Sequence, residues 1–222
     1  MVQTVKNNGL TRSEIEAGRK LFAGEWQFVA GAGSVQSLPP TRGIEIAFAG
    51  RSNVGKSSLL NALTGRRALA RVSKTPGRTQ QINFFTGGDD LVIADLPGYG
   101  FASAPRQKIN QWIGLVRVYL GGRANLARVF VLVDSRHGLK PQDLEVLSLL
   151  DRTAVSYAIV LTKIDAIKAQ NVESVVAETE AAIKKRPAAF PTTFPVSSLN
   201  TSGIAELRGA IARLLTERGA GA

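Results

Sequence analysis

The stretch IEIAFAGRSNVGKSSLL, residues 44–60, decides the fold and the first candidate site. A short apolar run at 44–49 leads into GRSNVGKS at 50–57, which fits the phosphate-binding pattern GxxxxGK[ST] and opens a helical stretch. Glycines let the backbone turn tightly and aim its N–H groups inward, while the start of a helix adds partial positive charge. The stretch therefore predicts a nucleotide-phosphate site, with kinase, ATPase and GTPase all open at this point.

Two side chains of this loop have specific expected roles. Lys56 is expected to bridge the β- and γ-phosphates, and the Ser57 hydroxyl is expected to ligate Mg²⁺. The residues expected to bind the nucleotide here are Gly50, Arg51, Ser52, Asn53, Val54, Gly55, Lys56, Ser57 and Ser58.

Apolar strands alternate with amphipathic helices from Ile44 onward. The strand candidates are 44–49, 82–86, 91–95, 127–134, 156–162 and 192–196. Two near-continuous apolar runs among them suit strands buried on both faces of a parallel sheet. Only the turn GGDD separates 82–86 from 91–95, which predicts an antiparallel hairpin. The pattern predicts a three-layer α/β domain, with an about six-stranded, mostly parallel sheet, one antiparallel hairpin strand and helices on both faces.

The chain is expected to comprise an N-terminal extension at 1–43, a single domain at 44–218 and a tail at 219–222. The extension is predicted to hold a short helix and a loop. Ser13 is the expected N-cap of that helix, and Glu16 occupies the capping-box position.

Two later helices are predicted by apolar residues at helical spacing. The first covers 104–120, with Gly121 placed to end it, and its apolar positions are Ile109, Trp112, Ile113, Val116 and Leu120. Trp112 is therefore expected in the core. The last helix has its apolar positions at Ile204, Leu207, Ile211, Leu214 and Leu215.

Composition narrows the function classes. The 222 residues include no cysteine, which excludes a disulfide scaffold, cysteine metal sites and thiol catalysis. No apolar run approaches the roughly 20 residues of a membrane span, and the N-terminus has no apolar signal-peptide core. A cytoplasmic protein without stable membrane association is expected. Its net charge of +11 indicates either a polyanionic partner, bound by shape and phosphate recognition, or only a basic solvated surface.

A second motif, LTKID at 161–165, follows the fifth strand candidate. The Asp165 carboxylate can accept two hydrogen bonds from guanine, and adenine lacks that pair of donors. The stem of Lys163 can lie along the base. Backbone N–H groups of the VSS segment can reach guanine O6, although serine-rich loops also cap helices, and one begins near Ser202. The residues expected on the guanine side are Thr162, Lys163, Ile164, Asp165, Val196, Ser197 and Ser198.

With these motifs in order, the chain resembles the translation-factor-related GTPases and, more narrowly, the EngB (YihA/YsxC) family of bacterial ribosome-biogenesis GTPases. The likeness runs from about Ile44 to Leu215. Its blocks are GRSNVGKSSLLNAL (50–63), SKTPGRTQQINFF (73–85), DLPGYGFA (95–102), DSRHGLKPQD (134–143) and LTKID (161–165). The resemblance implies GTP binding, slow hydrolysis to GDP and phosphate, and a role in maturing the large ribosomal subunit. The implied partners are the precursor particle and its rRNA. Nothing indicates an oligomer, so a monomer is expected.

The resemblance also implies residue roles around the phosphates. Thr79 is the implied switch I ligand of Mg²⁺, with Thr75 a competing candidate. Asp95 fits an outer-shell role at Mg²⁺, and the Gly98 N–H fits a γ-phosphate contact. The further residues implied to bind nucleotide are Gly77, Arg78, Thr79, Gln80, Gln81, Asp95, Leu96, Pro97 and Gly98.

Tyr99 stands where Ras-like GTPases place a water-orienting glutamine, so a low intrinsic rate is expected. In the related TrmE–Era group an asparagine at the position of Asn53 helps hold K⁺ against the phosphates; the alternative is that Asn53 only hydrogen-bonds the loop. The catalytic candidates are Lys56, Asn53 through K⁺, and Thr79. The only histidine, His137, is given no role.

Basic residues near switch I are expected to carry the docking on RNA. They are Arg66, Arg67, Arg71, Lys74 and Arg78. The run 184–186 is either a second contact or a solvated charge run. One alternative function is a basic RNA-binding scaffold in which nucleotide is mainly structural. A small-molecule kinase is disfavoured because the chain has no evident acceptor lid and carries TKID.

Overall fold

The computed structural model describes residues 9–66, 69, 81–87, 91–99 and 106–219, without the side chains of 106–113. The helices are α1 (Arg12–Ala23), α2 (Lys56–Thr64), α3 (Arg106–Gly122), α4 (Pro141–Arg152), α5 (Ala169–Ile183) and α6 (Ile204–Glu217), with 3-10 turns η1 (Val35–Ser37) and η2 (Ile164–Ala166). The strands are β1 (Gln27–Ala32), β2 (Ile44–Gly50), β3 (Ile82–Thr86), β4 (Leu91–Asp95), β5 (Leu126–Asp134), β6 (Tyr157–Thr162) and β7 (Phe194–Pro195).

The described strands form one sheet in the order β1-β3-β4-β2-β5-β6-β7. Strand β3 runs antiparallel to both of its neighbours, and the remaining pairs are parallel. The predicted mostly parallel sheet with one antiparallel hairpin strand is confirmed, although it has seven strands where about six were expected. The additional strand, β1, lies inside the extension that was predicted to hold only a helix and a loop.

Strand β1 was missed because its sequence, QFVAGA, shows no alternation of apolar and polar residues. It lies at the edge of the sheet, and its first three residues are exposed. Its pairing with β3 also shifts register between Phe28 and Ala30. An exposed, irregular edge strand does not show the alternation on which sequence patterns depend.

Helix α1 begins earlier than predicted, and its cap is a different residue. Thr11 is the N-cap: its hydroxyl accepts from the Glu14 N–H at 3.2 Å, and the Glu14 carboxylate accepts from the Thr11 N–H at 2.6 Å. The prediction of Ser13 and Glu16 was therefore wrong by two residues. Both pairs fit the same capping-box spacing, and the structure uses the earlier one.

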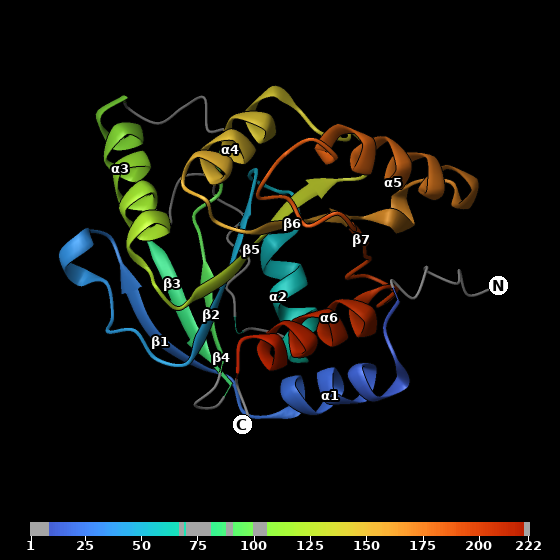
Figure 1. Ribbon diagram of the computed structural model, residues 1–222, viewed down its shortest axis with the longest axis horizontal. Helices are drawn as coiled ribbons and strands as arrows, with labels where there is room; N and C mark the ends of the chain where they lie inside the picture. The colour runs from blue at the N-terminus through green and yellow to red at the C-terminus, as the bar shows by residue number, and fades with distance from the viewer. Residues whose placement is uncertain (1–8, 67–68, 70–80, 88–90, 100–105, 220–222) are drawn as a thin grey trace.

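The N-terminal helix packs closely against the last helix. Figure 1 shows α1 lying beside α6. A Cβ added at Gly18 would lie 2.4 Å from the backbone carbon of Arg208, so the two helix backbones approach to a distance that only glycine allows. The extension thus packs directly on the last helix of the following domain.

Two apolar layers bury the sheet. On one face α1, α2 and α6 pack against it through a cluster that includes Phe22, Leu59 and Ile211. On the other face α3, α4 and α5 contribute Leu115, Leu147 and Ile183. The predicted helices on both faces are confirmed. Val116 and Leu120 are buried as expected, as are all five apolar positions predicted for the last helix, whereas the side chains of Ile109, Trp112 and Ile113 lie outside the described part.

The parallel strands place their carboxyl ends at one edge. Phe48 pairs with Asp95 and Asp134 pairs with Thr162, so β2, β4, β5 and β6 end near one another. The loops that follow these ends hold the predicted motifs. None of the described helices combines the length and apolar character needed to cross a membrane.

Candidate nucleotide site

The phosphate-binding loop joins β2 to α2, as the motif requires. Gly55 is the N-cap of α2 and adopts φ of 105°, a conformation that favours glycine. A Cβ at Gly50 would lie 2.8 Å from Val54 Cγ1 and 3.0 Å from Leu132 Cβ, so the loop can leave the strand there only as glycine. The first helical residue is Lys56.

Residues of the DLPG segment lie against this loop. The Lys56 ammonium donates to Asp95 Oδ1, and both side chains are largely buried. A Cβ on Gly98 would lie 3.2 Å from Ser52 Oγ and 3.3 Å from Ser52 N. The Ser52 Oγ is buried and has no hydrogen-bond partner among the described residues. The structure thus brings Lys56, Asp95 and Gly98 together, as the motifs predict.

Tyr99 does not occupy the position of a water-orienting group. Its side chain is only 6% exposed, and its hydroxyl donates to Asp143 Oδ1 of α4 at 2.8 Å. Burial, and then the charge of Asp143, raise the pKa of Tyr99 well above its ordinary value, so the phenol remains a neutral donor. Tyr99 therefore packs under α4, and the comparison with the glutamine of Ras-like proteins holds for its place in the sequence only. The residues that follow it, 100–105, lie outside the described part.

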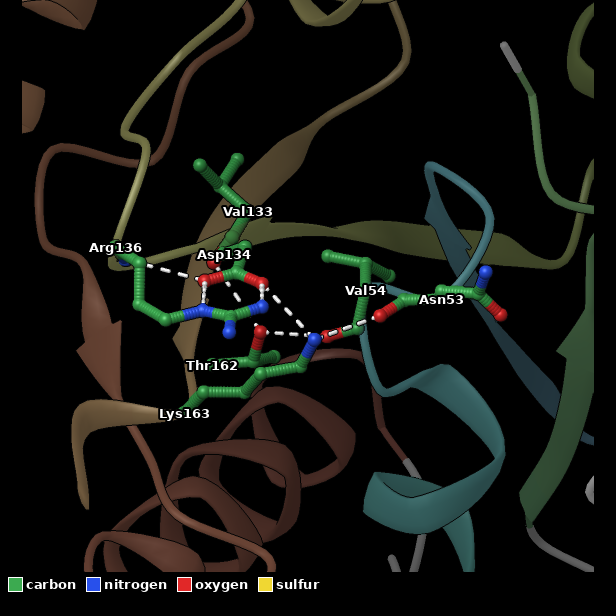
Figure 2. Close-up of polar contacts among 7 residues, drawn as sticks. All are labelled: Asn53, Val54, Val133, Asp134, Arg136, Thr162 and Lys163. Atoms are coloured by element: carbon green, nitrogen blue, oxygen red, sulfur yellow. Dashed lines mark hydrogen bonds and ion pairs between the residues drawn. The ribbon is translucent and has the colours of Figure 1, made fainter. Parts of the chain in front are cut away.

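A cluster at the end of β5 fixes the lysine of TKID (Figure 2). Lys163 Nζ donates to the Asn53 carbonyl at 2.7 Å and lies 2.9 Å from Asp134 Oδ2. Arg136 donates to both oxygens of the same carboxylate, at 2.9 and 2.7 Å. Burial tends to raise the pKa of Asp134, but the hydrogen bonds from Arg136 and Lys163 outweigh it and hold that pKa well below its usual range. Lys163 thus lies against the phosphate-binding loop.

Asp134 and Arg136 were given no role by the sequence prediction. The signal that could have identified them is DSR (134–136), which begins at the last residue of an apolar strand, and that strand ends at the same edge of the sheet as the strand before TKID. Thr162 adds a further link, because its hydroxyl donates to the Val54 carbonyl at 2.7 Å. The guanine-side and phosphate-side loops are thereby joined through polar contacts.

The VSS segment meets Asp165 through a side chain. Ser197 Oγ donates to Asp165 Oδ1 at 2.5 Å and accepts from the Leu199 N–H at 3.2 Å. The Ser197 N–H is donated to the Ser202 carbonyl at 2.9 Å. The Ser197 N–H, predicted to reach guanine O6, is thus already paired within the chain, and the hydroxyl of Ser197 orients the Asp165 carboxylate. For the Ser198 N–H the contact with guanine O6 stays a prediction. The Asp165 side chain is exposed.

The other predicted residues divide into lining, core and undescribed groups. Ser57 and Ser58 lie in the first turn of α2. Leu96, Ile164 and Val196 are buried core residues. Gln81 is exposed and donates to Asn83 at 3.1 Å. Pro97 is buried beside Leu96. Residues 70–80 lie outside the described part, and they include Thr75, Gly77, Arg78, Thr79 and Gln80.

These features define a class: a P-loop GTPase domain, with its phosphate loop after β2, an aspartate at the end of β4 and a Lys–Asp pair after β6. A family model described as "50S ribosome-binding GTPase" matches residues 45–163, more than half of the chain. A second, described as "Elongation factor Tu GTP binding domain", matches residues 119–217.

The chain belongs to the EngB family of bacterial GTP-binding proteins. It is 61% identical over 206 residues to the "Probable GTP-binding protein EngB" of Bradyrhizobium diazoefficiens, which covers 92% of this chain and 95% of the relative. The protein of the same name from Afipia carboxidovorans is 57% identical over 211 residues, covering 92% and 96%. The predicted family is confirmed, and the protein is a GTPase that binds GTP and GDP.

Solved structures agree with this assignment. The crystal structure of a probable GTP-binding protein EngB matches with a TM-score of 0.60 and 28% identity, covering 78% of this chain and all of the other. Aquifex aeolicus Era bound to GDP and aluminium fluoride matches with a TM-score of 0.64 and 21% identity, covering 78% and 57%. The second likeness shows the fold alone.

Proposed function

We propose that the protein is a GTP-dependent switch that assists assembly of the large ribosomal subunit. In its GTP form it docks on the precursor particle and its rRNA, and it leaves after hydrolysis. The observation that carries this proposal is the match of 45–163 to the family of 50S ribosome-binding GTPases. A net charge of +11 supports an RNA partner, and a cytoplasmic, monomeric protein suits that task.

The described basic residues differ in their availability for RNA. Arg186 forms an ion pair with Asp151 at 2.8 Å, so its charge is already compensated. Lys184 and Lys185, just beyond α5, are exposed and form no ion pair with any described carboxylate. Arg66 is exposed at the end of α2, whereas Arg67, Arg71, Lys74 and Arg78 lie outside the described part. Lys184 and Lys185 are therefore the pair to test first.

The residues at the phosphate end fit a nucleotide-bound Mg²⁺. This cation prefers oxygen ligands and keeps several waters, so it needs only one or two protein groups beside the phosphates. The described residues hold no group of three or more potential metal-ligating His, Cys, Asp or Glu, and they do offer the Ser57 hydroxyl and the Asp95 carboxylate at this end. The hydroxyls of Ser57 and of Thr79 or Thr75 would serve as ligands and Asp95 as an outer-shell group, while Lys56 would bind phosphate oxygens in place of Asp95. Bound Mg²⁺ supplies neutralisation of the phosphate charge.

A slow intrinsic rate of GTP hydrolysis follows from the position of Tyr99, because its hydroxyl is hydrogen-bonded to Asp143 and cannot orient a water.

Additional positive charge at the phosphates would come from K⁺ beside Asn53. The Asn53 side chain is exposed, and its amide makes no hydrogen bond within the described residues, which leaves it available as an oxygen ligand. GTP turnover should be faster in K⁺ than in Na⁺. Equal turnover in the two salts, with and without ribosomal particles, would remove the K⁺ site.

The decisive experiment measures affinity for large-subunit precursor particles with GDP and with a non-hydrolysable GTP analogue. The switch requires tighter binding with the analogue, and equal affinities would favour a basic scaffold in which nucleotide is only structural. Asp165→Asn adds a matched control. This variant should prefer xanthosine nucleotides, so its particle binding should require the xanthosine analogue in place of the guanosine one.

Charge variants locate the docking surface. The double change Lys184→Gln and Lys185→Gln should weaken particle binding and lower the salt dependence of the affinity by up to roughly 2 in the log–log slope. The matched control is Arg12→Gln with Lys20→Gln, which removes the same charge from exposed positions of α1. Equal losses in the two double variants would show a general charge effect and no contact at Lys184 and Lys185.

A further inference from the structure

Three segments that are distant in sequence converge on one buried carboxylate. Asp143, in the first turn of α4, is fully buried. Its Oδ1 accepts from the Tyr99 hydroxyl at 2.8 Å, and its Oδ2 lies 3.3 Å from Arg51 Nε of the phosphate-binding loop. We call Arg51, Tyr99 and Asp143 the Asp143 cluster. It connects the loop after β2, the segment after β4 and the start of α4.

The backbones of the first two segments are joined as well. The Tyr99 N–H donates to the Gly50 carbonyl at 3.2 Å, and the Ser52 N–H donates to the Tyr99 carbonyl at 3.1 Å. This parallel bridge between Arg51 and Tyr99 extends the β2–β4 pairing beyond the strands themselves. The segment after β4 is thereby fixed to the phosphate-binding loop by both backbone and side-chain contacts.

Asp143 depends on these contacts for its hydrogen bonds. A buried ionised carboxylate is costly unless it is paired and hydrogen-bonded. One oxygen accepts from the Lys140 N–H at 2.8 Å, which caps α4, and the other accepts from Tyr99 alone among the described residues. A displacement of Tyr99 would leave that oxygen buried without a donor. The arrangement therefore favours a single position of Tyr99.

Fixing Tyr99 also fixes Gly98, its neighbour. Gly98 lies so close to Ser52 that an added Cβ would come within 3.3 Å of its backbone nitrogen. We propose that the Asp143 cluster positions Gly98 against the phosphate-binding loop and thereby raises the affinity of this protein for GTP relative to its affinity for GDP. The inference rests on the proposed contact of the Gly98 N–H with the γ-phosphate. A Gly98 N–H that is already held in place stabilises bound GTP, because the segment after β4 need not be ordered when the nucleotide binds. It does nothing for GDP, which has no γ-phosphate.

In this assignment Arg51, Tyr99 and Asp143 are positioning residues. None of them is required to touch the reacting atoms. Loss of the contact between Tyr99 and Asp143 should weaken binding of a GTP analogue and leave GDP binding nearly unchanged. A purely structural role would instead lower the free energy of unfolding without changing the ratio of the two affinities.

Tyr99→Phe is the first test, with Tyr119→Phe as the matched control. Tyr119 is also fully buried and donates its hydroxyl to the buried carboxylate of Glu45 at 2.6 Å, away from the nucleotide site. Both variants lose one phenol–carboxylate hydrogen bond. Titration with GDP and with a non-hydrolysable GTP analogue gives the ratio of the two affinities. Relative to the unchanged protein, the affinity for the analogue divided by that for GDP should fall roughly 3- to 10-fold in Tyr99→Phe and stay the same in Tyr119→Phe.

Two further variants keep the outcome unambiguous. Gly98→Ala keeps the N–H but adds a Cβ 3.2–3.3 Å from Ser52, so it displaces Gly98 from the phosphate-binding loop. If the ratio of the affinities for the analogue and GDP survives this change, the placement of Gly98 does not set the ratio and the inference fails. If Gly98→Ala removes the preference while Tyr99→Phe keeps it, the contact stands and only the positioning role is overturned. Should Tyr99→Phe not fold, Asp143→Asn with Glu45→Gln as its control gives the same comparison. An equal shift in the variant and its control also overturns the proposal.

Discussion

Two buried clusters of the same chemistry lie at opposite ends of β2. At its start, the carboxylate of Glu45 accepts from the Tyr119 hydroxyl and pairs with Arg123, and we call these three the Glu45 cluster. Just past its end, the Asp143 cluster repeats the combination of carboxylate, phenol and guanidinium. Both carboxylates are fully buried.

The two clusters differ in the part of the molecule that supplies the arginine. Arg123 approaches Glu45 to 2.7 Å, is 8% exposed and also donates to the Pro39 carbonyl at 2.7 Å, so the Glu45 cluster joins scaffold elements only. Arg51 lies at 3.3 Å from Asp143, is 22% exposed and belongs to the phosphate-binding loop. The same chemistry therefore stabilises the fold at one end of the strand and holds a binding loop at the other. In parallel sheets the carboxyl end is where ligand-binding loops gather, which accounts for the difference.

The largest expected effect comes from Glu45→Ala. This change leaves the Arg123 guanidinium buried without its carboxylate, and breaking such a pair costs about 3–5 kcal/mol. Urea unfolding followed by circular dichroism measures the loss. The ratio of affinities for the GTP analogue and GDP should stay unchanged in the folded fraction. A changed ratio would end the distinction between the two clusters.

The contrast between the clusters also marks how far the sequence predicts the structure. The hairpin strands at 82–86 and 91–95 were predicted to the residue, because a short turn separates two clear apolar runs. The phosphate loop and TKID followed from motifs whose residues are neighbours in sequence. Tyr99 and Asp143 are 44 positions apart, and no spacing rule predicts that a side chain turns under a helix instead of toward the nucleotide.

Other errors have local causes. The Ser197 N–H was expected at guanine, but the turn that follows recruits it for the Ser202 carbonyl, and a competition between two acceptors of similar strength cannot be decided from residue types. Strand β1 was missed because an exposed edge needs no apolar pattern. Packing and local competition, which decide these details, leave no periodic signal in the sequence.

The second prediction is that both clusters respond alike to alkaline pH. Burial, and then the neighbouring carboxylate, raise the pKa of Tyr99 and of Tyr119 well above the ordinary value, and burial followed by the charge of Asp151 raises the pKa of Tyr157 to about 12. These are the only three tyrosines of the chain. In the unfolded chain a phenol ionises near pH ~10, whereas the folded phenols remain protonated there.

The sign of the effect follows from these directions. Because the folded pKa values are the higher ones, this contribution to stability is complete below pH ~10 and decreases as pH rises above it, by about 1.4 kcal/mol per pH unit for each phenol. Near-ultraviolet absorbance should show no phenolate from Tyr99 or Tyr119 until the protein unfolds, and then the signal of both together, whereas Tyr157 can ionise near pH 12 in the folded protein. Ionisation of Tyr99 or of Tyr119 alone in the folded protein would show that its site is open to water, and would separate the clusters.

The smallest effects are expected from exchanging the two arginines for lysine. Arg123 uses three nitrogens, bonding both oxygens of Glu45 and the Pro39 carbonyl, and its guanidinium lies 5.5 Å from the Phe84 ring centre. A lysine ammonium cannot match that planar fork, so Arg123→Lys should lower the free energy of unfolding by about 1–3 kcal/mol.

Arg51→Lys should cost less than about 1 kcal/mol, because Arg51 is partly exposed and its Nε forms no hydrogen bond within the described residues. The preference for the GTP analogue should fall only slightly, since Tyr99 still reaches Asp143 through its hydroxyl. Unfolding and nucleotide titration of the two lysine variants side by side measure both quantities. If Arg51→Lys lowers the preference as much as Tyr99→Phe does, the ion pair rather than the phenol holds the segment after β4, and the Asp143 cluster is controlled from the phosphate-binding loop.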